Sequence, residues 1–158
     1  MDVKYVNPFV ESVIENFSQF TGITPQKKGI SVFKEKSPKT EISAVIGITG
    51  SLSGSAVISF PKEIALKVAS SMLMDEKSEI NDEVKDAIGE FANISIGKAR
   101  NVIVDGGANI KISPPTIIVG RDHQIFFPPN IPVLEVIFDS DLGEFYILVG
   151  LKEKNGKV

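Results

Sequence analysis

Apolar residues recur three or four positions apart, the spacing of an amphipathic helix, in three stretches of this chain. The first helix is expected to begin at Asn7-Pro8, because asparagine caps a helix and proline suits its first position, and to end near Thr21-Gly22. Pro61 is expected to open the second helix and Asn81 to cap the third, which should end at Gly106-Gly107. The buried stripe predicted for the third helix consists of Val84, Ile88, Phe91, Ser95, Ala99 and Val102.

Apolar and polar residues alternate elsewhere, which is typical of half-buried strands. The strands predicted in this way are 28–36, 42–49, 56–60, 110–113, 116–119, 124–127, 133–138 and 144–151. Turns are expected at 37–39, 50–54 and 139–143, and the polar tail 152–158 should be frayed. Because most of these connections have hairpin length, we expect the strands to pair antiparallel.

A weak internal repeat divides the chain into two halves. In the first half the segment 49–54 leads into 55–60, and in the second half the similar segment 139–143 leads into 144–149. Each half also begins with a predicted helix. We therefore expect an α/β fold of the α+β type, with an antiparallel-rich sheet and a pseudo-twofold internal repeat.

Composition narrows the class of protein. The chain has 158 residues, 42% hydrophobic and 23% charged, which fits a single domain spanning residues 1–158. A net charge of −3 without a basic run argues against nucleic-acid binding. The absence of cysteine excludes disulfides, thiolate nucleophiles and cysteine zinc sites, and it fits a cytoplasmic protein. We expect no signal peptide and no membrane span, since no apolar run approaches about 18 residues.

A polar stripe on the third predicted helix is the main candidate for function. Asp86, Glu90 and Asn93 follow helical steps of four and three, on a different face from the buried stripe. Glu90 and Asn93 should lie about 4.5 Å apart along the helix axis. Their neighbours are small, which would let a partner approach: Ala87, Gly89, Ala92 and Gly97. Such a stripe is also what an ordinary solvated helix face presents, and the spacing alone does not identify a use.

Other motifs in the chain have simpler explanations. Gly97-Lys98 lacks the remaining residues of a phosphate-binding loop and lies inside a predicted helix. His123, the only histidine, is interpreted as a turn residue, although a Ser-His-Asp triad could formally use it. Asp139 and Asp141 could bind a cation, but an aspartate-rich hairpin turn explains them equally.

Four segments give the sequence a resemblance to the CheC/CheX family of chemotaxis phosphatases over essentially its full length. The similar segments are 7–11, 46–61, 82–97 and 114–120. The E-x-x-N signature of that family corresponds to Glu90 and Asn93. The resemblance implies the family's fold, with helices packed on one side of the sheet.

The resemblance also implies an activity and residue roles. A member of this family would dephosphorylate the aspartyl phosphate of the response regulator CheY, with Asn93 orienting the attacking water and Glu90 contacting the regulator. Asp86, Gly89 and Gly97 would contribute to the regulator-binding surface. No metal or cofactor of its own is implied, since magnesium is expected in the active site of the partner regulator. A carboxamide suits this task because it both accepts and donates hydrogen bonds.

One departure from the CheC pattern limits the number of sites. CheC proteins carry a second E-x-x-N motif on the first helix, whereas this chain has Ile14 three residues after Glu11. One site per chain is therefore expected. The family resemblance further suggests a homodimer joined through an edge strand. The alternative function is a non-catalytic module of the same fold, as in flagellar switch proteins.

Overall fold

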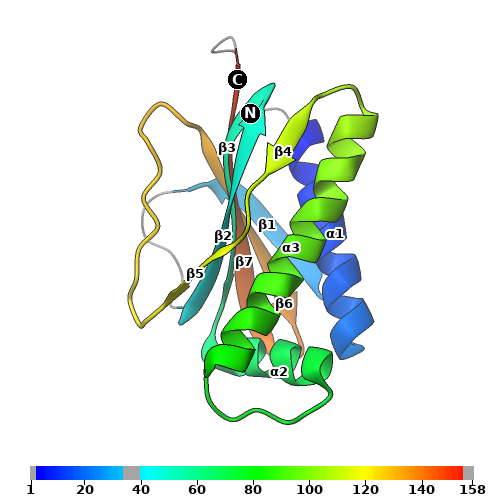
Figure 1. The fold of residues 1–158 in the computed structure, drawn as a ribbon, viewed down its shortest axis with the longest axis vertical. Coiled ribbons are helices and arrows are strands. Elements are labelled where there is room, and N and C mark those ends of the chain that lie inside the picture. The colour runs from blue at the N-terminus through cyan, green and yellow to red at the C-terminus, as the bar shows by residue number, and fades with distance from the viewer. Residues whose placement is uncertain (1–2, 34–39, 155–158) are drawn as a thin grey trace.

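The structure is a computed structural model that describes residues 3–33 and 40–154 (Figure 1). The helices in these residues are α1 (Val3–Thr21), α2 (Lys62–Leu73) and α3 (Asp82–Asp105). The strands are β1 (Gln26–Val32), β2 (Ile42–Gly50), β3 (Leu52–Phe60), β4 (Ile110–Ile112), β5 (Thr116–Val119), β6 (Val133–Ser140) and β7 (Gly143–Glu153).

All seven strands form one antiparallel sheet. The strand order is β1-β6-β7-β3-β2-β4, and β5 pairs with β2 alongside β4. The two halves of the chain exchange their outer strands, because β1 pairs with β6 whereas β4 and β5 pair with β2. The hairpin strands β3 and β7 meet in the centre. This arrangement confirms the predicted antiparallel sheet and the pseudo-twofold repeat.

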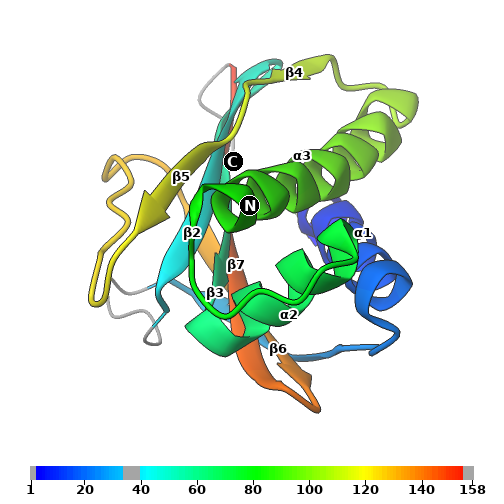
Figure 2. The ribbon, with the colours of Figure 1, turned by 60° about the horizontal axis from the view of Figure 1, so that its bottom comes forward.

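The three helices cover one face of the sheet, as expected (Figures 1 and 2). The core between helices and sheet is centred on phenylalanine rings that contact one another and come from both layers: Phe17, Phe60, Phe91, Phe138 and Phe145. Buried aromatic rings of this kind contribute large apolar areas. The core therefore fixes α1 and α3 against the sheet.

The opposite face of the sheet carries a second, smaller core. Its buried residues are Val57, Val133, Tyr146 and Leu148, and its partly buried members include Ile125, Phe127 and Ile131. The predicted strand 124–127 was wrong, because this segment forms no ladder. Its alternating apolar residues instead pack onto the sheet. Phe127 lies so close to Gly150 that a Cβ there would stand 2.7 Å from its ring.

Several predicted boundaries differ from the structure. Helix α1 begins at Val3 rather than at Asn7-Pro8, and Pro8 lies within it. Strand β1 ends at Val32, and the predicted turn 37–39 falls outside the described residues. Strand β3 begins at Leu52, so the predicted turn 50–54 is much shorter.

Two further corrections concern the ends of elements. Strand β7 extends to Glu153, so the start of the predicted tail belongs to the sheet; residues 155–158 lie outside the description. Val102 was predicted to be buried but is 53% exposed, whereas Ile103 is buried. Because an α-helix has 3.6 residues per turn, residues four apart share a face, and the buried stripe continues from Ala99 to Ile103.

Candidate functional site

Helix α3 is a long platform whose ends are defined by its own sequence. The Asn81 Oδ1 accepts a hydrogen bond of 3.0 Å from the backbone N–H of Val84, as predicted for a helix cap. Asp82 and Glu83 occupy the first turn, where the positive end of the helix dipole favours acidic side chains. The helix ends at Gly106, as predicted.

A buried amide fastens the back of this platform to α1. Asn16 is 1% exposed, and its Nδ2 donates to the Ser95 Oγ at 3.0 Å. The Ser95 hydroxyl donates in turn to the carbonyl of Phe91 at 2.8 Å. Phe91 and Ser95 flank Asn93 in sequence but face the core. Asn16 was not assigned a role from the sequence. Its position one helical step after the apolar Val13 could have indicated a buried asparagine.

The front of the platform carries the predicted polar stripe. Asp86, Glu90 and Asn93 are all exposed. Within the part of the chain that the structure describes, neither Glu90 nor Asn93 has a hydrogen bond or ion pair through its side chain. The carboxylate and the carboxamide one turn further along are therefore available to a partner.

The two glycines assigned to the binding surface have different surroundings. A Cβ at Gly97 would meet no heavy atom within 4 Å, so the surface beside Asn93 is open. Gly89 is buried, and a Cβ there would stand 3.5 Å from both Ile117 Cδ1 and Pro115 Cγ. Gly89 thus packs against the segment that follows β4, and its contact with a partner stays a prediction.

A groove of about 600 Å³ runs beside the stripe. The residues lining it from α3 are Lys85, Asp86, Gly89, Glu90 and Asn93, and those from the opposite side are Ile112, Ser113, Pro114, Pro115 and Ile117. All but Gly97 of the five predicted site residues therefore line one groove. Its opposite side was not assigned to the site from the sequence, although the similar segment 114–120 includes part of it.

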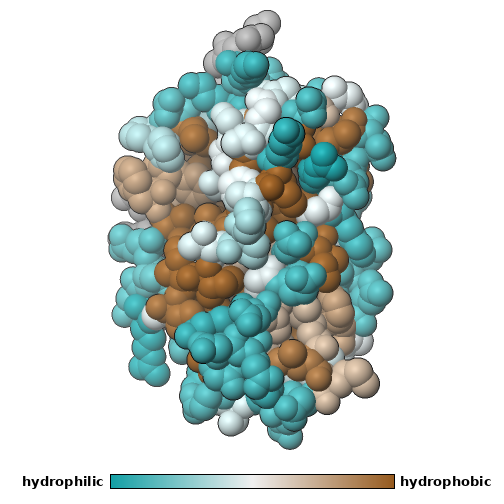
Figure 3. Space-filling model, in the orientation of Figure 1, coloured by the Kyte–Doolittle hydropathy of each residue, from teal (hydrophilic) through white to brown (hydrophobic). Residues whose placement is uncertain are grey.

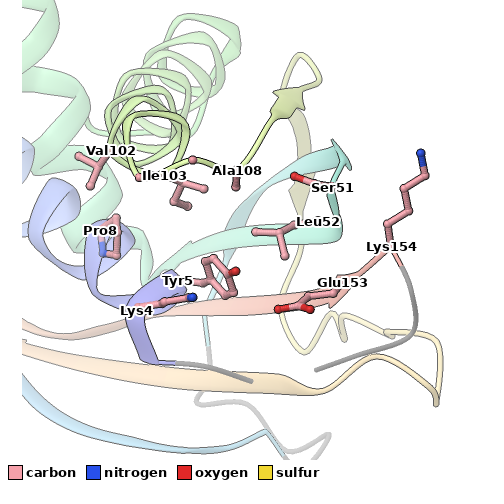
Figure 4. Close-up of a pocket in the computed structure, with 12 residues that line it drawn as sticks. Lys4, Tyr5, Pro8, Ser51, Leu52, Val102, Ile103, Ala108, Glu153 and Lys154 are labelled. Carbon is pink, nitrogen blue, oxygen red and sulfur yellow. The ribbon is translucent and has the colours of Figure 1, made fainter.

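A larger cavity lies away from the stripe. It has a volume of about 690 Å³ and lies between the start of α1, the end of α3 and the end of β7. Tyr5 and Pro8 from α1 face this cavity together with Val102 and Ile103 from α3 (Figure 4). None of the predicted site residues lines it, so volume alone does not indicate the functional site.

The remaining candidates from the sequence are accounted for by local structure. Lys98 lies inside α3 and pairs with Glu15 of α1 at 3.4 Å. His123 follows a turn, and its Nε2 lies 2.6 Å from the buried Ser43 Oγ while its Nδ1 lies 2.7 Å from the Gly120 carbonyl. Asp139 lies opposite Glu144 in the antiparallel register of β6 and β7, and Asp141 lies in the turn of that hairpin.

The described residues hold neither a cluster of metal ligands nor a helix that could cross a membrane. Within residues 3–33 and 40–154, no three histidine, aspartate or glutamate side chains gather closely enough to hold a metal ion. Every helix in the described part of the chain is too short or too polar to cross a bilayer.

Comparison with known proteins gives consistent matches. The family model described as "Chemotaxis phosphatase CheX" matches residues 42–139. The curated CheY-P phosphatase CheX of Thermotoga maritima is 36% identical over 126 residues, which cover 79% of this chain and 81% of that protein. The chemotaxis protein CheX of Desulfovibrio desulfuricans is 33% identical, with a TM-score of 0.86 over 94% of this chain and 99% of that one.

A further solved structure matches in fold. It is a CheX–CheY–BeF3–Mg2+ complex from Borrelia burgdorferi, in which the matching chain has a TM-score of 0.77 and 24% identity, over 96% of this chain and 100% of that one. The family model covers most of this chain, including the whole E-x-x-N helix, and the curated relative agrees with it. The protein with this sequence therefore belongs to the CheX family of chemotaxis phosphatases.

Proposed function

We propose that this protein is a hydrolase that removes the phosphoryl group from the aspartyl phosphate of a CheY-type response regulator. The observation that carries the proposal is the exposed, unpaired Glu90 and Asn93 side chains beside a groove on α3. They occupy the family's signature positions, and the curated relative is a CheY-P phosphatase.

Asn93 is the proposed catalytic residue. Its carboxamide oxygen accepts a hydrogen bond from water and its nitrogen donates to a phosphoryl oxygen, which places the water in line with the phosphorus. The water oxygen then bonds to phosphorus, the bond to the aspartate oxygen breaks, and the products are inorganic phosphate and the free carboxylate. An acylphosphate is already activated, so positioning suffices and no general base from this chain is needed.

The acidic part of the stripe is proposed to bind the regulator. Glu90 lies one turn before Asn93, so a basic group that pairs with Glu90 sets the position of the carboxamide over the phosphoryl group. Asp86 lies one turn before Glu90 and enlarges the acidic surface. The open surface at Gly97 leaves room for the partner's backbone. Magnesium is expected in the regulator's own acidic site, where it supplies charge neutralisation at the phosphoryl oxygens.

The alternative function is a non-catalytic module, because a fold does not determine an activity. A purely structural module has no use for an exposed carboxylate and carboxamide at signature spacing. We favour the phosphatase for this reason.

We also propose that the protein is a cytoplasmic homodimer joined through an edge strand. Strand β1 is exposed at all seven of its residues, and among the described residues it pairs on one side only, with β6. An unpaired edge of this length is a template for another strand.

Phosphate release from acetyl-phosphate-charged CheY, with and without this protein, tests the activity. Asn93→Ala should lower kcat by about a hundredfold or more, because water positioning contributes several kcal/mol to the barrier. Asn101→Ala is a matched control, since Asn101 is an exposed asparagine on the same helix. Glu90→Gln should raise KM for the charged regulator. Equal rates for Asn93→Ala and Asn101→Ala, or no acceleration by the parent protein, would exclude the proposed role.

A further inference from the structure

The groove beside Glu90 and Asn93 has a second side that the proposed chemistry does not use. We propose that this side is a docking surface for the response regulator and sets its affinity. Its apolar wall is formed by Pro114, Pro115 and Ile117 in the groove and is continued beyond the groove by Val119 on β5. The inference rests on the proposed function and adds to it a binding role for the segment after β4. It assigns the two sides of the groove to different tasks, catalysis on α3 and docking on the wall.

The wall is held rigidly in place. The backbone N–H of Ser113 donates to the carbonyl of Gly47 at 2.9 Å, and the N–H of Gly47 donates to the Ser113 Oγ at 2.8 Å. Two consecutive prolines then restrict the backbone. On the helix side, Gly89 faces Pro115 and Ile117, and a Cβ there would make ordinary van der Waals contacts of 3.5 Å with both, so the wall lies about one methyl group away from α3. A preordered surface of this kind loses little entropy when a partner binds.

The wall points apolar side chains to the same side of the sheet as α3. Ile117 and Val119 pair with Ala44 and Ile42, whose side chains belong to the core beneath the helices. Lying beyond α3 at the sheet edge, Ile117 remains half-buried and Val119 is 45% exposed. Hydrophobic surface is visible over β5, and polar and apolar patches alternate along α3 (Figure 3).

The two sides of the groove differ in charge, which specifies the chemistry of the partner. Asp86 and Glu90 have no ion-pair partner among the described residues, whereas Lys85 pairs with Asp82 at 3.4 Å. The α3 side is therefore acidic and the opposite side apolar. A complementary surface carries an apolar side chain next to a basic group. Because Asn93 lines the same groove, this surface must lie beside the phosphoryl group of the regulator.

A pair of valine substitutions tests the docking role. Val119→Ser replaces two methyl groups of the wall by one hydroxyl. Val102→Ser makes the same change at a 53% exposed valine near the end of α3, beside the other cavity and away from the wall. Val119→Ser should raise KM for the phosphorylated regulator by about fivefold and leave kcat within about twofold, since it removes binding made equally in the ground and transition states. Val102→Ser should leave both constants unchanged.

The outcomes separate this inference from the proposed function. If Asn93→Ala is inactive but Val119→Ser has the parent KM, the docking role is wrong and the phosphatase assignment stands. If the parent protein has no phosphatase activity, calorimetry with beryllofluoride-charged regulator and magnesium decides: weaker binding of Val119→Ser alone supports docking, and equal binding of both variants refutes it. If Val119→Ser has a lower oligomeric mass than the parent protein and an unchanged KM, a second copy of the chain covers the wall. This result would also refute the docking role.

Discussion

Asn16→Ala tests whether the buried amide on α1 holds α3 in place. Asn16 and Ser95 are 1% and 0% exposed, and the 3.0 Å hydrogen bond between them joins residues 79 positions apart in sequence. The second contact of the Asn16 Nδ2, to the Phe91 carbonyl, is long at 3.5 Å and contributes little. The Ser95 hydroxyl keeps its own bond to Phe91 in the variant.

The size of the effect follows from these contacts. Losing one buried hydrogen bond costs about 1 kcal/mol. The space left by the amide, which nothing fills, adds a further cost of about 1–2 kcal/mol. The expected decrease in the free energy of unfolding is therefore about 2–3 kcal/mol, or about 4–12 °C in Tm for a chain of this length.

Urea unfolding of a double-mutant cycle measures the pair directly. Asn16→Ala and Ser95→Ala should show a coupling energy of about 1 kcal/mol, because each substitution breaks the same bond. Ser12→Ala is a control, since Ser12 is buried on α1 at 6% exposure without a hydrogen bond to α3 in the described structure. Additive effects within about 0.3 kcal/mol, or parent stability for Asn16→Ala, would refute the reasoning.

Three further predictions concern other parts of the molecule. Gly97→Leu should fold, because its Cβ meets open space, but should abolish turnover by blocking the regulator; Gly97→Ala should raise the free energy of unfolding by about 0.5–1 kcal/mol. Burial raises the pKa of Glu135 from 4.5, so its contribution to stability is full below that value and is lost as pH rises through the raised value. Glu135→Gln should therefore flatten the decline of Tm toward neutral pH, and an unchanged profile would contradict this. Light scattering at micromolar concentration should give about twice the 17.1 kDa chain mass, and a strictly monomeric mass would exclude the dimer.

The sequence by itself determined helix α3 and which of its residues face the core and which face the solvent. A cap, a buried stripe and a polar stripe all depend on the local repeat of 3.6 residues per turn. For that reason the Asn81 cap, the end at Gly106 and the exposure of Glu90 and Asn93 could be predicted without knowing what the helix packs against. The β2–β3 and β6–β7 hairpins also depend on local sequence, and they supply four of the seven strands of the sheet.

Tertiary structure alone decided which distant residues complete the site. The Asn16 amide reaches Ser95 because α1 and α3 pack against each other. The second side of the groove is held in place because β4 and β5 pair with β2 and because Ser113 hydrogen-bonds to Gly47. The alternation of apolar and polar residues at 124–127 did not distinguish a paired strand from a segment that packs onto the sheet, since both have the same period of two residues. These contacts join parts of the chain that carry no information about each other's position, so they follow from packing the whole sheet and its helices together.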